Sequence, residues 1–475
     1  MVFSSAIFLF YFLPFFLLGY FLIPARFRNL YATAASLAFY AWGAPTFLTI
    51  FLASCLTDYL LARKISQVDT IAVRKRLLWV SMILNVGLLL YFKYANFFVE
   101  QFTWVAHGLG MHVGKWHKVI LPIGISFFTF HKISYVVDVY RRTSPPVRNF
   151  AEYLLYITFF PQLIAGPIVR YHEIQDQIRQ RKISWDGFTE GAWRFILGLG
   201  SKTLIADPMA AVATHVFSEK PFDISVGYTW LGTLAYSMQI YFDFAGYSSM
   251  AIGLALMVGF RFPENFNHPY LAISVTDFWR RWHMSLSRWM RDYLYIPLGG
   301  NRVSPGRQMV NLWIVFLISG FWHGAQWTFV AWGVFHGGFL AFERTPLGHK
   351  YLALPVALRR AFTFVAVMFG WVLFRSDNIS DATARWARMV GLGAESPAIP
   401  RASIISDFGF FVLALAVAWC FIVEPLVEKL QETSPHKRPI YEAYPFLYPA
   451  LIVICLLSLM FIEAGRYSPF IYFQF

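Results

Sequence analysis

Long apolar runs alternate with short polar segments along the whole chain, and this pattern predicts a protein built from membrane helices. A helix needs about 20 apolar residues to cross a hydrocarbon core. The apolar runs are residues 3–23, 30–62, 77–92, 119–139, 153–169, 228–258, 312–342, 356–374, 408–423 and 446–462. They predict roughly 10–12 crossings, together with re-entrant or interfacial helices.

Three runs are irregular. Pro45 interrupts the run 30–62, which predicts either one kinked helix or two elements. The run 312–342 is too long for one straight crossing, and its small residues predict a break near Gly320–Gly324, where another backbone can approach closely. Segment 188–216 has a mixed composition and predicts either a membrane helix or an interfacial one.

Composition agrees with this pattern, since 57% of the residues are hydrophobic, whereas a soluble globular protein has about 45–50%. The fold class is therefore an all-α polytopic membrane protein. The longest polar stretches, 63–76, 170–185 and 393–406, have the lengths of loops, so residues 1–475 are interpreted as a single membrane domain. Residues 1–23 carry no charge, which predicts a retained first helix and not a secretory signal.

The net charge of +14 matches the Lys and Arg excess of cytoplasmic loops. The densest short basic segment lies within residues 63–76, which we expect on the cytoplasmic side. The basic residues form no single face, so nucleic-acid binding is not indicated. The three cysteines lie in apolar runs without ligand spacing, so neither a metal site nor a disulfide is predicted: Cys55, Cys420 and Cys455.

Residues 274–294 differ from the apolar runs around them. Ser274 and Asp277 fit a capping box at the start of a helix. At helical spacing, the segment has an apolar stripe of Trp282, Leu286, Trp289 and Tyr293. It also has a polar stripe of Thr276, Arg280, His283, Ser287 and Arg291, which Arg281, Ser285, Arg288 and Asp292 widen. One amphipathic helix is expected, which either grips anionic lipid at the cytoplasmic interface or lines a polar cavity. The turn-rich loop 297–302 can present N–H groups to an anion.

A second candidate is His323, an imidazole inside an apolar run. Polar side chains at membrane depth by default mark functional sites, and the alternative is a hydrogen bond to a neighbouring helix. His336 lies roughly 220° further round the helix, so we interpret it as a packing residue unless the helix breaks. Asp243 is expected to pair with an arginine of segment 274–302. Asp138, on one face with His131, is expected at the membrane interface.

Several motifs together resemble the membrane-bound O-acyltransferase superfamily, and within it the branch that takes part in alginate and other bacterial polysaccharide acetylation. The motifs that carry the resemblance are residues 1–5, 92–97, 121–127, 164–167, 241–248, 279–302 and 321–324. The related teichoic acid D-alanyl transferases share the two histidines but lack the Arg280–Arg281 pair and the tail at 298–302. His131 and Lys132 stand where the alginate proteins carry an acidic residue and a small one.

The resemblance implies a helical disc with a central tunnel that reaches a buried histidine. The catalytic histidine of the family falls on His323, and its second motif histidine on His283. An acyl thioester such as acetyl-CoA is expected to arrive from the cytoplasm, with no tightly bound cofactor and no metal. The acyl group would leave toward a hydroxyl on the other side.

We therefore expect O-acetyl transfer during O-acetylation of an exported polysaccharide, in a bacterial inner membrane. His323 is the expected general base, and His283 is expected to orient a substrate or to stabilise negative charge. A covalent acyl-histidine intermediate is an alternative. Donor phosphates are expected to bind Arg280, Arg281, Arg288, Arg291, Asn301 and Arg302. Supporting roles are expected for Asp243, Asp292, Trp322 and His336.

Expected partners are the thioester donor, a periplasmic acetyltransferase, polysaccharide synthesis and export proteins, and membrane lipid. Three alternatives differ in class or substrate. The first is transfer of D-alanyl or another acyl group to a cell-envelope polymer. The second is a proton-coupled transporter or flippase that uses His323 and Asp243, although the sequence has no visible inverted repeat. The third is a structural subunit of an export complex.

Overall fold

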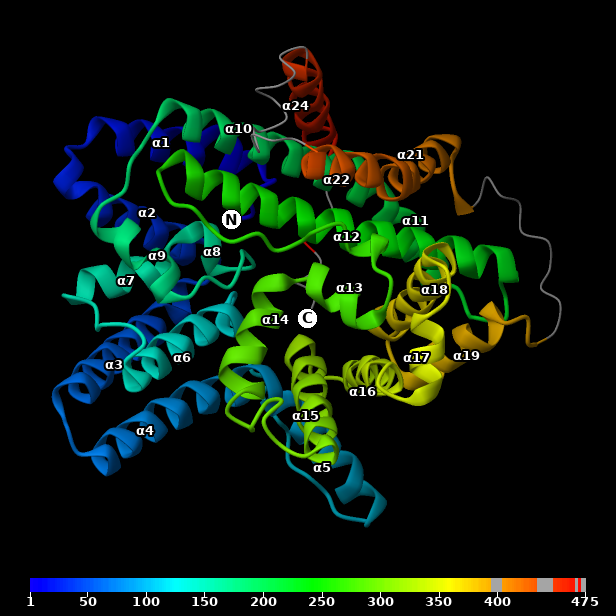
Figure 1. Cartoon of the computed structure of the whole chain (residues 1–475), viewed down its shortest axis with the longest axis horizontal. Coiled ribbons are helices and arrows are strands. Elements are labelled where there is room, and N and C mark those ends of the chain that lie inside the picture. The colour runs from blue at the N-terminus through cyan, green and yellow to red at the C-terminus, as the bar shows by residue number, and fades with distance from the viewer. Residues whose placement is uncertain (394–403, 434–446, 466–468, 471–475) are drawn as a thin grey trace. The chain divides into compact units, whose positions relative to one another are not determined.

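The computed structural model describes residues 1–475 apart from 394–403, 434–446, 466–468 and 471–475. Within these described ranges every regular element is a helix (Figure 1). The α-helices of the first half are α1 Leu13–Leu22, α2 Arg28–Gly43, α3 Leu48–Gln67, α4 Ile71–Leu89, α5 Ala95–Gly108, α6 Ile125–Arg141, α7 Phe150–Thr158, α8 Phe160–Leu163, α9 Tyr171–Arg179, α10 Trp185–Gly200, α11 Asp207–Ser218 and α12 Val226–Met257.

The second half continues with α13 Val275–Arg281, α14 Met284–Met290, α15 Pro305–His323, α16 Trp327–Phe342, α17 Pro346–Leu352, α18 Val356–Arg375, α19 Ile379–Met389, α21 Asp407–Ala418, α22 Glu424–Thr433 and α24 Leu447–Glu463. Short π-helices are η1 Phe8–Phe12, η4 Leu90–Tyr94, η5 Ser201–Ala206, η7 Arg291–Tyr295 and η8 Trp419–Val423. The 3₁₀ turns are η2 Ala25–Phe27, η3 Pro45–Phe47 and η6 Pro269–Leu271.

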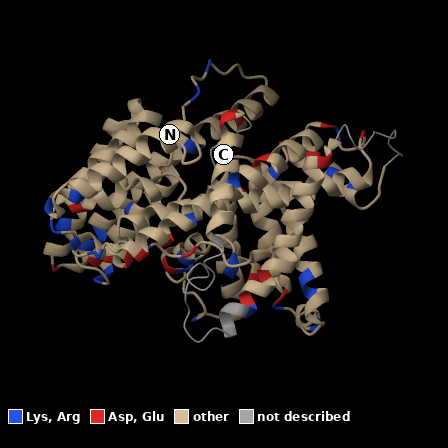
Figure 2. Ribbon diagram, turned by 90° about the horizontal axis from the view of Figure 1, so that it is seen from above, with Lys and Arg blue, Asp and Glu red and all other residues tan. Residues whose placement is uncertain are grey.

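The protein is an all-α, multi-pass membrane protein, as the apolar runs predict. Six helices in the described ranges are long and apolar enough to cross a membrane: Pro45–Gln67, Ile71–Gly108, Trp185–Ser218, Val226–Met257, Val356–Arg375 and Asp407–Lys429. Shorter apolar helices are Phe8–Leu22, Trp327–Phe342 and Tyr448–Glu463. Figure 2 shows long stretches of helix without charged residues. The expected 10–12 crossings exceed these six because several apolar runs fold as broken, shorter helices.

The breaks have local causes. The run 30–62 divides at Ala44 into α2 and α3, and Pro45 starts the next turn, so the two-element alternative is correct. The run 153–169 divides at Phe159 into the short helices α7 and α8. Segment 188–216 belongs to a continuous apolar helix long enough to span a membrane.

The chain forms two compact units. Unit 1 consists of Met1–Gly191 and Leu254–Pro263, and unit 2 of Ala192–Gly253 and Glu264–Phe475. Each unit is described by itself below. The interpretation of residues 1–475 as one domain stays a prediction.

Unit 1 contains a buried ion pair between helices α6 and α3. The Nζ atom of Lys132 lies 3.1 Å from Oδ2 of Asp58. Ser81 and Asn85 of α4 donate hydrogen bonds to the same carboxylate at 2.6 and 2.8 Å. Three polar side chains from two helices therefore compensate the Asp58 carboxylate away from solvent, as a buried charge requires. This arrangement explains the lysine at position 132 structurally, as the counter-ion of Asp58.

Candidate active site

His323 is the last residue of α15, in unit 2, and its side chain is buried in an aromatic pocket. The centroid of its ring lies 4.8 Å from that of Trp322, 4.9 Å from that of Trp332 and 5.5 Å from that of Phe374. Helix α16 begins only at Trp327, so the expected break near Gly320–Gly324 is confirmed. The break places the imidazole at a helix end inside the protein.

Small residues allow α15 and α16 to pack backbone against backbone beside His323. A Cβ atom on Gly320 would lie 2.3 Å from the carbonyl oxygen of Phe329, and one on Gly333 would lie 2.4 Å from that of Phe316. Both distances are far shorter than van der Waals contact, so only glycine fits at these positions. The expected close approach of a second backbone is therefore correct, and the approaching helix is the next one in the chain.

The hydrogen bond of His323 defines which of its nitrogens carries a proton. Nδ1 lies 2.6 Å from the carbonyl oxygen of Ser319. Because a carbonyl oxygen only accepts, Nδ1 must donate its N–H to it. In the neutral ring, Nε2 then carries a lone pair. That is the protonation state that a general base needs.

His283 lies in a break between helices, and here the expectation of one continuous helix over 274–294 is wrong. Helix α13 ends at Arg281, Trp282 is extended, and His283 has a left-handed backbone with φ 44° and ψ 52° before α14 begins at Met284. The start is as expected, because the Ser274 hydroxyl caps the backbone N–H of Asp277 at 3.0 Å. The carboxylate of Asp277 reaches the N–H of Ile273, so the capping box is shifted by one residue. The polar and apolar stripes therefore do not continue through His283.

Asn265 holds this break in place. Its Oδ1 atom accepts from the backbone N–H of Ser285 at 3.1 Å and from the Ser285 hydroxyl at 2.8 Å, and Nδ1 of His283 lies 3.2 Å away. The backbone N–H identifies the accepting atom as the amide oxygen, so Nδ1 of His283 must be the donor. The amide Nδ2 of Asn265 donates to the Ser248 hydroxyl at 3.0 Å. Neutral His283, like His323, therefore keeps the lone pair on Nε2.

The two histidines share one aromatic neighbour. The Trp322 ring packs against His323 and lies 6.3 Å from His283, while Phe244 packs against His283 at 4.7 Å. His283 lies outside the candidate spanning helices. Burial lowers its pKa well below the ordinary value of 6.5, and the nearby His323 lowers this pKa further. His283 is therefore neutral at physiological pH, with the tautomer set by Asn265.

His336 packs against the same aromatic cluster from α16. The indole N–H of Trp279 donates to Nδ1 of His336 at 3.4 Å, and the Trp332 ring lies 4.8 Å from the His336 ring. Trp332 also contacts His323, so the helix break brings both histidines to one cluster although a straight helix would separate them. The contacts of His336 agree with a packing role.

The two acidic residues with expected supporting roles, Asp243 and Asp292, each lie beside a cationic side chain. Lys202 of η5 lies 3.1 Å from Asp243 and 2.6 Å from Asp207. The structure thus pairs Asp243 with a lysine of a preceding helix, whereas the sequence favours an arginine of segment 274–302. The carboxylate of Asp292 binds the neighbouring Arg291 at 2.7 Å.

The side chains expected to bind the donor differ in how many ion pairs and hydrogen bonds they already form within unit 2. Arg281 binds Asp277 and Glu428, both at 3.1 Å, so its charge is compensated. The side-chain oxygen of Asn301 accepts a hydrogen bond from the Tyr295 hydroxyl. The guanidinium group of Arg288 donates to the Glu264 carbonyl oxygen at 3.4 Å. The side chains of Arg280 and Arg302 are exposed and form no ion pair within the described ranges. These two arginines are the most available to an anionic donor.

A cavity of about 210 Å³ lies beside Asn265. Its lining includes Ser248, Glu264 and Asn265, and also Gly198 and Gly246. A Cβ on Gly198 would lie 2.5 Å from the Gly246 carbonyl, so α10 and α12 touch at this point. Asn265 therefore links the cavity wall to His283. Across the described residues, no group of three His, Cys, Asp or Glu side chains is arranged to hold a metal ion.

Sequence reasoning missed Asn265 and Ser248. Asn265 stands in a polar loop before the histidine segment, and neither a spacing nor a motif marks it in the sequence. Its role depends on a contact that spans 18 residues and on the backbone break at His283. Ser248 belongs to the motif at 241–248 but has no chemical feature that separates it from other serines.

His323 and His283 are thus buried at the ends and breaks of helices in unit 2, and the comparisons with known proteins show the family. A family model described as MBOAT, membrane-bound O-acyltransferase family, matches residues 29–349. The chain belongs to this family. It is similar to a probable alginate O-acetylase of Azotobacter vinelandii, with 40% identity over the full length of both chains.

Two further relatives have other acceptors in their names. A peptidoglycan O-acetyltransferase of Helicobacter pylori is 35% identical, over 100% of this chain and 98% of the relative. A teichoic acid D-alanyltransferase of Bacillus subtilis is 28% identical, over 54% of this chain and 69% of the relative. The protein is thus a membrane-bound O-acyltransferase of the alginate O-acetylase type.

Proposed function

We propose that this protein transfers an acetyl group from a cytoplasmic acyl thioester, such as acetyl-CoA, to a hydroxyl group during O-acetylation of an exported polysaccharide. The observation that carries the proposal is the pair of buried imidazoles, His323 and His283, in each of which Nδ1 donates a hydrogen bond, so that the neutral ring has its lone pair on Nε2. Full-length similarity to O-acetylating relatives supports acetyl as the transferred group.

His323 acts as the general base. Its Nε2 takes the proton of the acceptor hydroxyl as the oxygen attacks the thioester carbonyl carbon. The C–S bond then breaks, the acetyl group remains on the acceptor oxygen, and the leaving thiolate takes the proton from the imidazolium. No net proton is gained or lost. The Ser319 carbonyl fixes the ring throughout this cycle through the Nδ1–H.

His283 orients the reacting groups while it remains neutral. Its Nε2 accepts a hydrogen bond from an N–H group of the thioester donor, and the Asn265 amide keeps the ring from turning. The exposed Arg280 and Arg302 attract the phosphates of the donor, with Arg288 and Arg291 nearby in the sequence. The acetyl group passes from here toward the outer side, to a polysaccharide or to a periplasmic acetyltransferase. A cytoplasmic donor and an acceptor on the other side require the protein to lie in a bacterial inner membrane.

Purified protein with labelled acetyl-CoA and a polysaccharide acceptor tests this proposal. Wild type should transfer label, and His323→Ala should lower turnover by about 10²–10⁴-fold, as loss of a general base does. His107→Ala, which removes an exposed histidine, is the matched control. Normal turnover in His323→Ala at equal membrane levels would exclude the catalytic role.

D-alanyl transfer is the second candidate, supported by the Bacillus subtilis relative. It has weaker support because that similarity covers about half of the chain. A labelled D-alanyl thioester in the same assay distinguishes the two donors. Movement of substrate across vesicle membranes without acyl transfer would instead favour the transporter. Absence of both transfer and transport would favour a structural subunit.

A further inference from the structure

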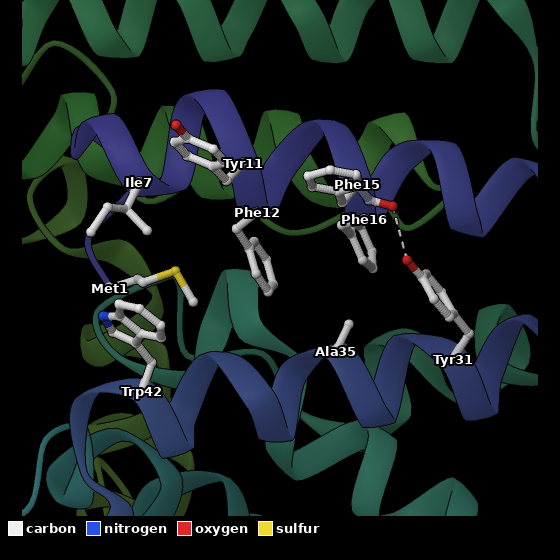
Figure 3. A pocket seen from close by; sticks show the side chains of 9 residues that line it. All are labelled: Met1, Ile7, Tyr11, Phe12, Phe15, Phe16, Tyr31, Ala35 and Trp42. Atoms are coloured by element: carbon white, nitrogen blue, oxygen red, sulfur yellow. Dashed lines mark hydrogen bonds between the residues drawn. The ribbon is translucent and has the colours of Figure 1, made fainter.

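Unit 1 has a groove between its first two helices that is lined almost entirely by apolar side chains (Figure 3). The groove has a volume of about 510 Å³. Its walls come from α1 with the preceding η1 and from α2, and Phe12, Phe15 and Phe16 point into or along it (Figure 3). Phe15 is 67% exposed and Tyr11 is 62% exposed, so the groove is open to the surroundings of the protein.

The groove has defined ends and an open middle. At one end the Tyr31 ring crosses from α2 to α1, where its hydroxyl donates to the Phe15 carbonyl at 3.0 Å. Gly19 makes this crossing possible, because a Cβ there would lie 2.3 Å from the Tyr31 oxygen. At the other end lie Met1 and Trp42, and between the ends α2 contributes only the methyl group of Ala35 (Figure 3). A small residue in the middle leaves an elongated channel.

Two arginines precede Tyr31 in the chain. Arg26 lies in the turn η2 between α1 and α2, and Arg28 starts α2 one turn before Tyr31. Their guanidinium groups lie over aromatic rings, Arg26 over Phe27 at 4.7 Å and Arg28 over Tyr20 at 5.6 Å. Within the described ranges neither arginine pairs with a carboxylate. Both arginines lie outside the groove lining, in the turn and first helical residue that precede Tyr31 in the chain.

We propose that this groove binds one acyl chain of an anionic phospholipid, with the lipid phosphate at Arg26 and Arg28. An apolar groove on a membrane helix gains little by exchanging one lipid chain for another, so selectivity must come from charge. Basic residues near a membrane surface attract anionic headgroups. The elongated shape suits a chain, and the two arginines that precede Tyr31 match a phosphate with net negative charge. The groove belongs to unit 1 and the histidines to unit 2, and the occupant of the groove does not depend on the proposed reaction.

Native mass spectrometry of the full chain tests the site, with protein reconstituted in equal amounts of phosphatidylglycerol and phosphatidylcholine. One phosphatidylglycerol should remain bound to wild type. Ala35→Trp should remove it by filling the channel, whereas Ala34→Trp, on an exposed face of the same helix, should retain it. Arg26→Gln with Arg28→Gln should lower retention roughly thirtyfold, from about 1 kcal/mol for each charge.

A second measurement covers the case in which a variant folds poorly. Phosphatidylglycerol with brominated chains should quench the fluorescence contributed by Trp42, defined as the difference between wild type and Trp42→Phe. Brominated phosphatidylcholine should quench it less. Equal quenching by both lipids, or equal retention of both by wild type, would refute the proposal. So would loss of lipid from Ala34→Trp to the same extent as from Ala35→Trp.

Discussion

The amide oxygen of Asn265 and Nδ1 of His283 are joined by a hydrogen bond of 3.2 Å, and Ser285 fixes the direction of that bond. Because the backbone N–H of Ser285 can only donate, the oxygen of Asn265 must face it, and the proton between Asn265 and His283 must belong to the histidine. A side chain outside the histidine segment therefore determines which nitrogen of neutral His283 carries the lone pair.

Asn265→Leu should lower turnover roughly 5- to 150-fold, since leaving buried donors unsatisfied costs about 1–3 kcal/mol. Asn265→Asp keeps an acceptor and should fold, but its charge favours the imidazolium form of His283. The pH–rate profile of Asn265→Asp should therefore move to higher pH. The exposed Asn267→Leu, in the same loop, is the control. Unchanged kinetics and an unchanged pH profile in both Asn265 variants would show that the contact is only structural.

Gly320→Ala should reduce both activity and thermal stability. The new methyl group would lie 2.3 Å from the Phe329 carbonyl, so α16 must move away from α15, at a cost of about 1–3 kcal/mol. Gly338→Ala is the control on α16, because its methyl group would have its nearest neighbour at 3.8 Å. Turnover and melting temperature in detergent measure the effect. Equal behaviour of the two variants would contradict the close packing at Gly320.

Arg280 and Arg281 should behave differently although they are adjacent. Arg280→Ala, and to a lesser extent Arg291→Ala, should raise the KM for the donor with a smaller effect on kcat. Arg281→Ala should instead lower the melting temperature, because it leaves Asp277 and Glu428 without their partner. Calorimetric titration with donor separates binding from stability. Normal donor binding by Arg280→Ala and Arg291→Ala would assign this surface to lipid or to a partner protein.

Lys132→Met should destabilise unit 1 strongly, by about 3–5 kcal/mol, because it leaves the Asp58 carboxylate buried without a counter-ion. The double variant Lys132→Met with Asp58→Asn should recover much of this loss, since the amide keeps hydrogen bonds with Ser81 and Asn85. Thermal unfolding of wild type, Lys132→Met, Asp58→Asn and the double variant gives the coupling energy. Additive losses in the double variant would argue against a direct ion pair.

A cysteine at Arg302 should react with a membrane-impermeant thiol reagent only after the inner face of the membrane is opened. The prediction follows from a cytoplasmic donor and from the excess of basic residues expected on that side. Cys55, Cys420 and Cys455 are replaced first, and a cysteine at the exposed Lys75 serves as the expected cytoplasmic reference. Labelling of the Arg302 position in intact cells would reverse the orientation.

Much of the helical framework could be predicted from local patterns in the sequence. The lengths of the apolar runs indicated the helices, and Pro45 indicated the division into α2 and α3. The glycines around His323 indicated both the helix break and the close packing of α15 and α16. These features are determined by residues that are neighbours in the chain. Local sterics and hydrophobicity therefore suffice to predict them.

The site depends more on contacts between distant segments. The spacing of residues in 274–294 fits one helix, but the hydrogen bonds from Asn265 hold His283 in a left-handed conformation that interrupts it. Lys202 pairs with Asp243 from a different helix, and no periodicity within either segment reveals that partner. The broken α15–α16 pair likewise brings His336 to the cluster around Trp332, which helical geometry alone argues against.

The end of α15 at His323 gives the site a fixed electric field. The carbonyl oxygens in the last turn of a helix carry about half a negative charge, and the Ser319 carbonyl points at Nδ1. These groups belong to the backbone, so they do not titrate and no substitution removes them. This partial negative charge favours a positive charge at position 323. The preference therefore results from the position at which the helix ends. A lysine placed there would experience the same preference, and an aspartate would be opposed by it.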